Sequence, residues 1–206
     1  MDASGVVAIV GVVASAATGF GGVWLGSSRA TRTARQLAAD QREWTERQQI
    51  REHQEQAAKL FDGELLTLMS RVPQGNDLAD NVRVPLGTAY NELEEIWRRH
   101  EILGDEEIRQ RYFTLNSLIF MAYNDSVGNA GQELNLWPLR VAYEDLRNAL
   151  RGYLLREPPA QAALPRSTEV IALANPGGTW AGVRGVFDYL IDREVQQMSQ
   201  PRRPPA

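Results

Sequence analysis

The chain has 206 residues, a formal net charge of −4 and no cysteine. The lack of cysteine excludes disulfides, thiolate metal sites and cysteine nucleophiles. The one clear basic excess lies beside an apolar N-terminal stretch, so the rest of the chain lacks the basic face that nucleic-acid binding usually needs, and we expect no nucleic-acid partner.

Residues 3–28 contain no charged side chain and consist mostly of Val, Ala, Gly and Ile. A helix of this length covers roughly 39 Å, more than the roughly 30 Å of hydrocarbon in a bilayer. We therefore expect residues 1–28 to form a transmembrane anchor. A cleavable signal peptide would need a basic segment before its apolar core, and Asp2 has the opposite charge.

Arginines follow the apolar stretch closely, whereas Asp2 is the one charged residue before it. The basic flank consists of Arg29, Arg32 and Arg35, and such an excess marks the cytoplasmic side and favours contact with anionic lipid. Trp24 is placed as an interface anchor among the lipid head groups. These features predict a single-pass protein of the cell (plasma) membrane, with the N-terminus outside and the C-terminal domain in the cytoplasm.

Small residues recur within the span at steps of three or four, which places them on one helical stripe. The stripe includes Gly11, Ser15, Gly19, Gly22 and Gly26. Close backbone approach along such a stripe drives helix association in lipid. We predict that the spans pack together and give a homodimer, and the alternative is a glycine-rich span without a partner.

Residues 29–58 are polar, rich in glutamine and uninterrupted by proline or glycine, which predicts a juxtamembrane stalk helix. Glu43 and Arg47 form a favourable i,i+4 pair. One heptad position holds Leu37, Trp44, Arg51 and Ala58, and the other seam position holds Gln41, Gln48 and Glu55. A strong coiled coil would be apolar at both positions, so two alternatives stay open: a solvated spacer helix and a weak parallel coiled coil.

Residues 59–199 are expected to form a bundle of four or five helices, which makes the predicted fold all-α. Apolar residues at helical spacing occur within residues 60–72, 86–103, 108–122, 139–154 and 180–198, and a short helix is expected at Ser167–Ala174. Residues 126–131 read as a loop. No sustained alternating run of β-branched residues is present, so no strand is expected.

Cap residues and breakers set the expected helix ends. Pro85 lies near the start of the second bundle helix, Asp105 caps the third, and Thr179 caps the last. The third helix has a broad apolar arc, which predicts a central position with several neighbours. Residues 200–206 are expected to be a disordered tail.

The residues point to no reaction. His53 falls in the polar stalk and His100 on the core stripe of its helix, so neither is placed as a metal ligand. Glu94 and Glu95 are each expected to pair with the arginine four residues later rather than to act as acid and base. We predict no catalytic, cofactor-binding or metal-binding residues.

The order of a Gly-rich span with Trp24-Leu25-Gly26, arginines at 29, 32 and 35, a Gln-rich helix and an amphipathic bundle resembles uncharacterised small single-pass membrane proteins of GC-rich Gram-positive bacteria. The resemblance covers the first sixty residues. It implies a membrane setting and carries over no functional residue.

Two hypotheses about function follow. The first is a membrane-anchored, non-enzymatic interaction or scaffold protein whose cytoplasmic bundle docks an unidentified protein partner. The second is a ligand sensor or enzyme with a pocket between the bundle helices, lined by the aromatic residues Tyr90, Trp97, Tyr112, Tyr143 and Tyr153. A small pore of associated spans is disfavoured because the stripe has no charged residue.

Overall fold

The structure is a computed structural model, and it describes the backbone of residues 3–73, 75–100, 103–158 and 160–199 and, within these ranges, the side chains from 36 to 196. The elements in order are α1 (Ala3–Met69), β1 (Asn76–Leu78), α2 (Ala79–His100), α3 (Glu106–Gly128), β2 (Glu133–Asn135), α4 (Trp137–Leu155), α5 (Ser167–Ala174), the 3₁₀ turn η2 (Pro176–Gly178) and α6 (Gly182–Ser199). The chain divides into two compact units, Met1–Glu52 and His53–Ala206. The second is a helical bundle, as the sequence predicts.

The described part of the first unit is helical throughout. From residue 36 to residue 52 the side chains are exposed, apart from the half-buried Gln48, and Arg47 pairs with Glu43 at 2.5 Å as predicted. In the part of the chain whose side chains are described, no helix combines the length and apolarity of a membrane span. The expected span at 3–28 lies outside that part, as does the tail at 200–206, so both stay predictions.

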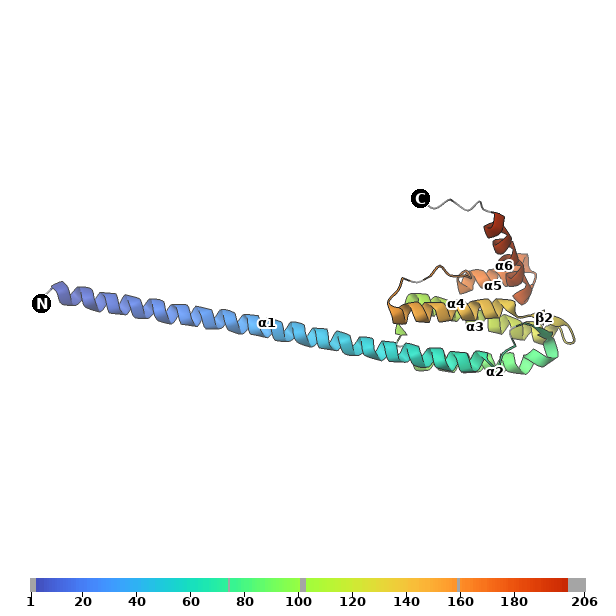
Figure 1. Cartoon of the computed structure of the whole chain (residues 1–206), viewed down its shortest axis with the longest axis horizontal. Helices are drawn as coiled ribbons and strands as arrows, with labels where there is room; N and C mark the ends of the chain where they lie inside the picture. The colour runs from blue at the N-terminus through green and yellow to red at the C-terminus, as the bar shows by residue number, and fades with distance from the viewer. Residues whose placement is uncertain (1–2, 74, 101–102, 159, 200–206) are drawn as a thin grey trace. The chain divides into compact units, whose positions relative to one another are not determined.

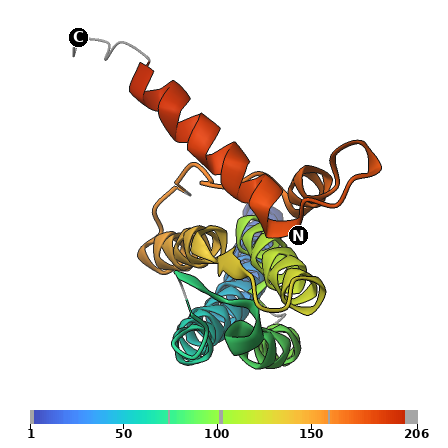
Figure 2. The same ribbon diagram turned by 90° about the vertical axis from the view of Figure 1, so that its right-hand side faces the viewer.

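Helix α3 is the central element of the second unit. Helices α2, α3 and α4 run side by side, and α6 lies obliquely to them (Figures 1 and 2). Contacts join α3 to α2, α4, α5 and α6, which confirms the position that its broad apolar arc predicts. Asp105 caps the helix as expected, because its carboxylate accepts the Ile108 N–H at 3.0 Å.

An aromatic cluster joins α1, α2 and α3. The rings of Trp97 and Tyr112 stack with centroids 4.3 Å apart, and Phe61 meets Trp97 edge to face at 5.9 Å. All three side chains are buried. Each ring removes at least about 150 Å² from water, so its burial contributes roughly 4 kcal/mol before the entropy cost of folding.

Two short strands correct the expectation that the chain has none. Asn76 lies opposite Asn135 and Leu78 opposite Glu133 in an antiparallel pair. Backbone bonds extend this ladder, because Leu136 N–H donates to Gly75 O and Ala79 N–H donates to Gln132 O. Three residues are too few for an alternating pattern to be read from sequence.

Helix boundaries differ from expectation at two points. Helix α2 begins at Ala79, so Pro85 lies inside it rather than near its start; Asp77 fixes the earlier start by accepting from Leu78 N–H and from the Asn81 side chain. Helix α3 continues to Gly128, into the expected loop. The short helix α5 has the predicted bounds.

The start of α6 is fixed by a buried carboxylate on α3 instead of by Thr179, and the predicted Thr179 cap is wrong. Asp125 accepts the Val183 N–H and the Trp180 Nε1–H, both at 2.8 Å. Burial raises the pKa of Asp125 above its usual value, and the two hydrogen bonds oppose that rise. A carboxylate from another helix thus satisfies a free N–H at the helix N-terminus.

Two glycines allow α6 to approach its neighbours. Gly182 has φ +55°, and a Cβ there would lie 2.0 Å from a carboxylate oxygen of Asp125. At Gly185 a Cβ would lie 2.2 Å from the carbonyl oxygen of Leu173 on α5. A larger residue at either position would displace α6.

We expect Gly182→Ala to lower the free energy of unfolding by at least about 2 kcal/mol, because it adds an overlap with Asp125 to an unfavourable φ. Urea unfolding of the full chain, followed by tryptophan fluorescence, measures the change. The matched control is Gly63→Ala in α1, where a Cβ meets nothing within 4 Å. This control should raise stability by about 0.5–1 kcal/mol. Equal effects of the two variants would contradict the packing described for Gly182.

Asp125 also gives a pH dependence with a definite sign. Since its pKa is raised in the folded state, it contributes stability that is fully present below the unfolded value of 3.8 and is lost as the pH rises through the folded value. Asp125→Asn should remove this contribution to the slope of the free energy of unfolding against pH. It should also cost about 1–3 kcal/mol, because an amide offers one acceptor where two donors need one each. Unfolding midpoints at several pH values test this, and an unchanged slope would contradict it.

Candidate functional site

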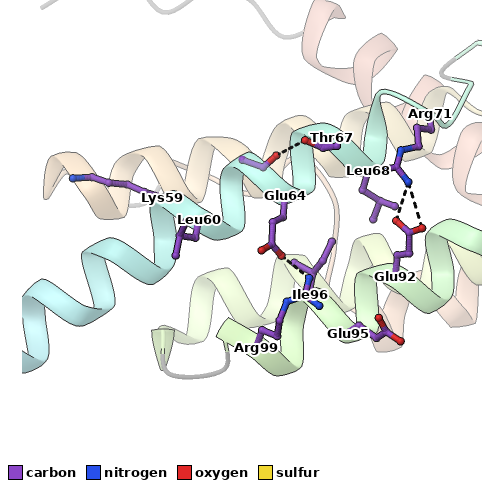
Figure 3. A pocket seen from close by; sticks show the side chains of 11 residues that line it. Lys59, Leu60, Glu64, Thr67, Leu68, Arg71, Glu92, Glu95, Ile96 and Arg99 are labelled. Carbon is purple, nitrogen blue, oxygen red and sulfur yellow. Dashed lines mark hydrogen bonds and ion pairs between the residues drawn. The ribbon is translucent and has the colours of Figure 1, made fainter.

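A groove of about 540 Å³ runs between the C-terminal part of α1 and α2, within the second unit (Figure 3). The residues that line it are Lys59, Leu60, Gly63, Glu64, Thr67, Leu68, Arg71, Glu92, Glu95, Ile96 and Arg99. From Lys59 to Leu68 the α1 wall extends about 14 Å along the helix axis, and Arg71 lies in the turn that follows α1. The α1 part of the wall is thus as long as a helical peptide of two to three turns.

The floor of the groove is apolar. Leu68 and Ile96 are buried, and Leu60 stands at the edge with 52% of its surface exposed. Gly63 leaves an opening between them, because a Cβ at this position would meet nothing within 4 Å. Apolar side chains of a ligand could therefore lie beside Gly63 and contact Leu60, while Leu68 and Ile96 expose 2% and 5% of their surface below.

Two ion pairs join the walls of the groove. Arg71 Nη1 lies 3.2 Å from Glu92 Oε2, and Arg99 Nη2 lies 2.7 Å from Glu64 Oε2 (Figure 3). All four side chains are more than a third exposed, so the pairs contribute little to stability. The two pairs present charges of both signs. Each charged side chain could pair with a charged group of a ligand instead, with a small loss of free energy.

Glu64 is held in its charged form. The hydrogen bond from Arg99 lowers the pKa of this carboxyl more than partial burial raises it. A carboxylate with a lowered pKa is a weak proton acceptor. The site is thus better suited to recognising charge than to moving a proton.

His100 lies beneath this ion pair as a buried structural residue. Its side chain is 7% exposed and meets the Phe61 ring edge to face at 6.0 Å. Its Nε2 lies 3.5 Å from Glu64 Oε2. The core position predicted for His100 is confirmed.

A second cavity, of about 320 Å³, lies where the proline-rich connection between α4 and α5 crosses α3. Arg111 is buried there with 4% of its surface exposed. Its Nη1 donates to the carboxylate and to the backbone oxygen of Asp145, each at 3.1 Å, and its Nη2 donates to Ala160 O. Thr114 and Arg193 donate to further carbonyls of the connection.

In this second cavity Arg111 and Asp145 fix the proline-rich connection in place, and we call this pair the buried clamp. Burial raises the pKa of Asp145, while the backbone N–H of Ala163 and the charge of Arg111 oppose the rise. Both charges are therefore used to hold the connection against α3 and α4. We assign the cavity a structural role.

The sequence identifies part of these arrangements. The predicted pair of Glu94 with Arg98 is confirmed at 2.6 Å. The predicted pair of Glu95 with Arg99 is wrong, because Arg99 binds Glu64 on α1 instead. Glu64 was missed, since its partner lies 35 residues away and local spacing gives no sign of such a contact.

The residues expected to act in the membrane fall on α1, but their side chains lie outside the described residues. They are the packing residues Gly11, Ser15, Gly19, Gly22 and Gly26, the interface anchor Trp24 and the basic flank Arg29, Arg32 and Arg35. Their roles stay predictions. Among the described residues, no three His, Asp or Glu side chains converge as a metal site would require.

The aromatic residues of the pocket hypothesis lie in or against the core. Trp97, Tyr112 and Tyr143 are buried, and Tyr90 packs on Phe120 with ring centroids 5.5 Å apart. Burial raises the pKa of Tyr112 to about 12. None of these rings forms part of the groove wall.

Comparison with protein families, with curated proteins and with solved structures gave no match.

The buried clamp gives a test by double substitution. Arg111→Met should cost about 3–5 kcal/mol, because the Asp145 charge then stays buried without the guanidinium that pairs with it. Without Arg111 the Asp145 pKa rises further, so the stability lost at neutral pH should partly return as the pH falls through that pKa. Urea unfolding at pH 5 and pH 7.5 measures this.

The control for this clamp is the double variant Arg111→Met with Asp145→Leu. It should lose less stability than the sum of the two single variants, because no unpaired charge is left. Strictly additive losses, or a loss from Arg111→Met that is the same at both pH values, would contradict the ion pair.

Proposed function

We propose that the chain is a membrane-anchored, non-enzymatic interaction protein whose helical bundle docks a protein partner in the cytoplasm. The observation that carries the proposal is the groove between α1 and α2, in which an open apolar floor lies between charged walls. A surface of this kind suits recognition of another protein, because apolar contacts supply affinity and rim charges supply specificity.

The membrane part of the proposal rests on the sequence. The uncharged stretch within residues 1–28 is long enough to span a bilayer, and Arg29, Arg32 and Arg35 follow it on the side expected to be cytoplasmic. The small-residue stripe with Gly22 and Gly26 supports pairing of two spans.

The groove favours one kind of partner, a short amphipathic helix. Its apolar side chains would cover Leu60 and pack beside Gly63, above the buried Leu68 and Ile96. Charges of both signs along its edges would complement the groove, which offers Arg71 and Arg99 as well as acidic side chains on its walls.

The second hypothesis, a sensor or enzyme with a pocket between the helices, has less support. Two of its five aromatic residues, Trp97 and Tyr112, stack on each other in the core at 4.3 Å, and Tyr153 lines a cavity of about 230 Å³. Rings that fill a core in this way are not free to line a ligand cavity. We therefore retain docking as the proposal.

Gly63→Trp should abolish docking while leaving the fold intact, because the new side chain fills the open space above the groove floor. Gly63→Ala is the matched control, since a methyl group leaves the groove open. Proximity labelling in living cells, with the label fused at the C-terminus, compares the two variants, the wild type and a chain without residues 1–28.

Specific cytoplasmic proteins labelled by the wild type and by Gly63→Ala, but lost with Gly63→Trp and with the truncated chain, would support the proposal. The same proteins labelled by all four chains would contradict the role of both the groove and the anchor. Labelling of extracytoplasmic proteins would contradict the orientation.

A further inference from the structure

We infer that residues 37–52 of α1 form a parallel coiled-coil interface with a second copy of this chain. The inference concerns the first unit alone and goes beyond the proposed docking groove. It chooses between the two alternatives that the stalk sequence leaves open.

Two large apolar side chains stand exposed on one side of this segment. Leu37 and Trp44 have 62% and 63% of their surface exposed. A separation of seven residues returns a helix to nearly the same side, so the two share one face. An indole and a leucine aligned in this way give an apolar stripe that the seam of a coiled coil can cover. Ile50, with 57% of its surface exposed, lies off this stripe.

The residues between them suit an identical partner. Gln41 and Gln48 occupy the other seam position of the same heptad frame. In a parallel pair in register, each carboxamide meets its own equivalent, and every amide has both a donor and an acceptor for the other. Polar seam residues of this kind fix register at a cost in stability.

Charge complementarity supports the parallel arrangement. In such a pair, the residue before each of Gln41 and Gln48 faces the residue five places later in the partner. Arg47 then faces the partner's Glu52, and Asp40 faces the partner's Thr45, so no like charges meet at these flanking positions. On the seam itself Arg51 meets its own equivalent, which costs stability, and Glu52 follows it directly in both chains. The pair of Arg47 with Glu52 forms twice by symmetry.

The ion pair seen within one chain does not oppose this exchange. Arg47 binds Glu43 with side chains that are 74% and 61% exposed, so this contact contributes little. Glu43 lies off the seam and stays solvated in the pair. Arg47 can therefore turn to the partner chain with little loss of stability.

Cysteine cross-linking tests the interface cleanly, because the chain has no cysteine of its own. Full chains with Gln41→Cys or Gln48→Cys on the seam are compared with Ala39→Cys and Glu46→Cys on the opposite face. After mild oxidation of cell membranes, we expect at least about threefold more disulfide-linked dimer from the seam variants, since a disulfide requires Cβ atoms about 4 Å apart. Fractionation of the same cells reports separately on the anchor.

Charge reversal gives a second readout in the Gln41→Cys background. Arg47→Glu should reduce the dimer several-fold, and adding Glu52→Arg should restore it, because the attraction is then inverted rather than lost. Arg42→Glu, away from the seam, is the control and should change nothing. Equal cross-linking at all four cysteine positions, as a dimer joined elsewhere would give, or a failure of Glu52→Arg to restore the dimer, would overturn the inference.

Discussion

The second unit depends on the burial of polar anchors along α3. Arg111, near the start of this helix, holds the proline-rich connection, and Asp125, near its end, holds the beginning of α6. The two are separated by roughly 21 Å of helix. Apolar contacts make α3 the centre of the bundle, but they act without direction. The hydrogen bonds of these two side chains determine where the later segments attach.

Much of this fold can be read from the sequence, because each helix contains its own signal. The apolar spacing, the Asp105 cap and the bounds of α5 are local features, and the structure has them as predicted. The central position of α3 follows from the width of its apolar arc. The expected membrane segment has an equally local signal, although its side chains lie outside the described residues.

The rest depends on contacts between distant residues. Asp125 on α3, rather than Thr179, accepts a hydrogen bond from the first turn of α6. Likewise, Arg99 pairs with Glu64 on α1 rather than with Glu95 on its own helix. Strands β1 and β2 exist because their two chain segments meet beside the bundle. The groove has the same origin, since its walls come from two helices and spacing within either one does not show that they face each other.

The attachment of α5 and α6 has a consequence for the motions of the molecule. Their link to α4 is a proline-rich connection whose carbonyl groups are held by Arg111, Thr114 and Arg193, and proline carries no N–H with which to build a ladder of its own. When those few side-chain bonds open, the aromatic cluster of Phe61, Trp97 and Tyr112 is left intact on the other helices. The C-terminal segment also shares the apolar core through residues such as Val170 and Val186, so we expect its amide hydrogens to exchange with solvent earlier than those of α3, though not independently of the bundle.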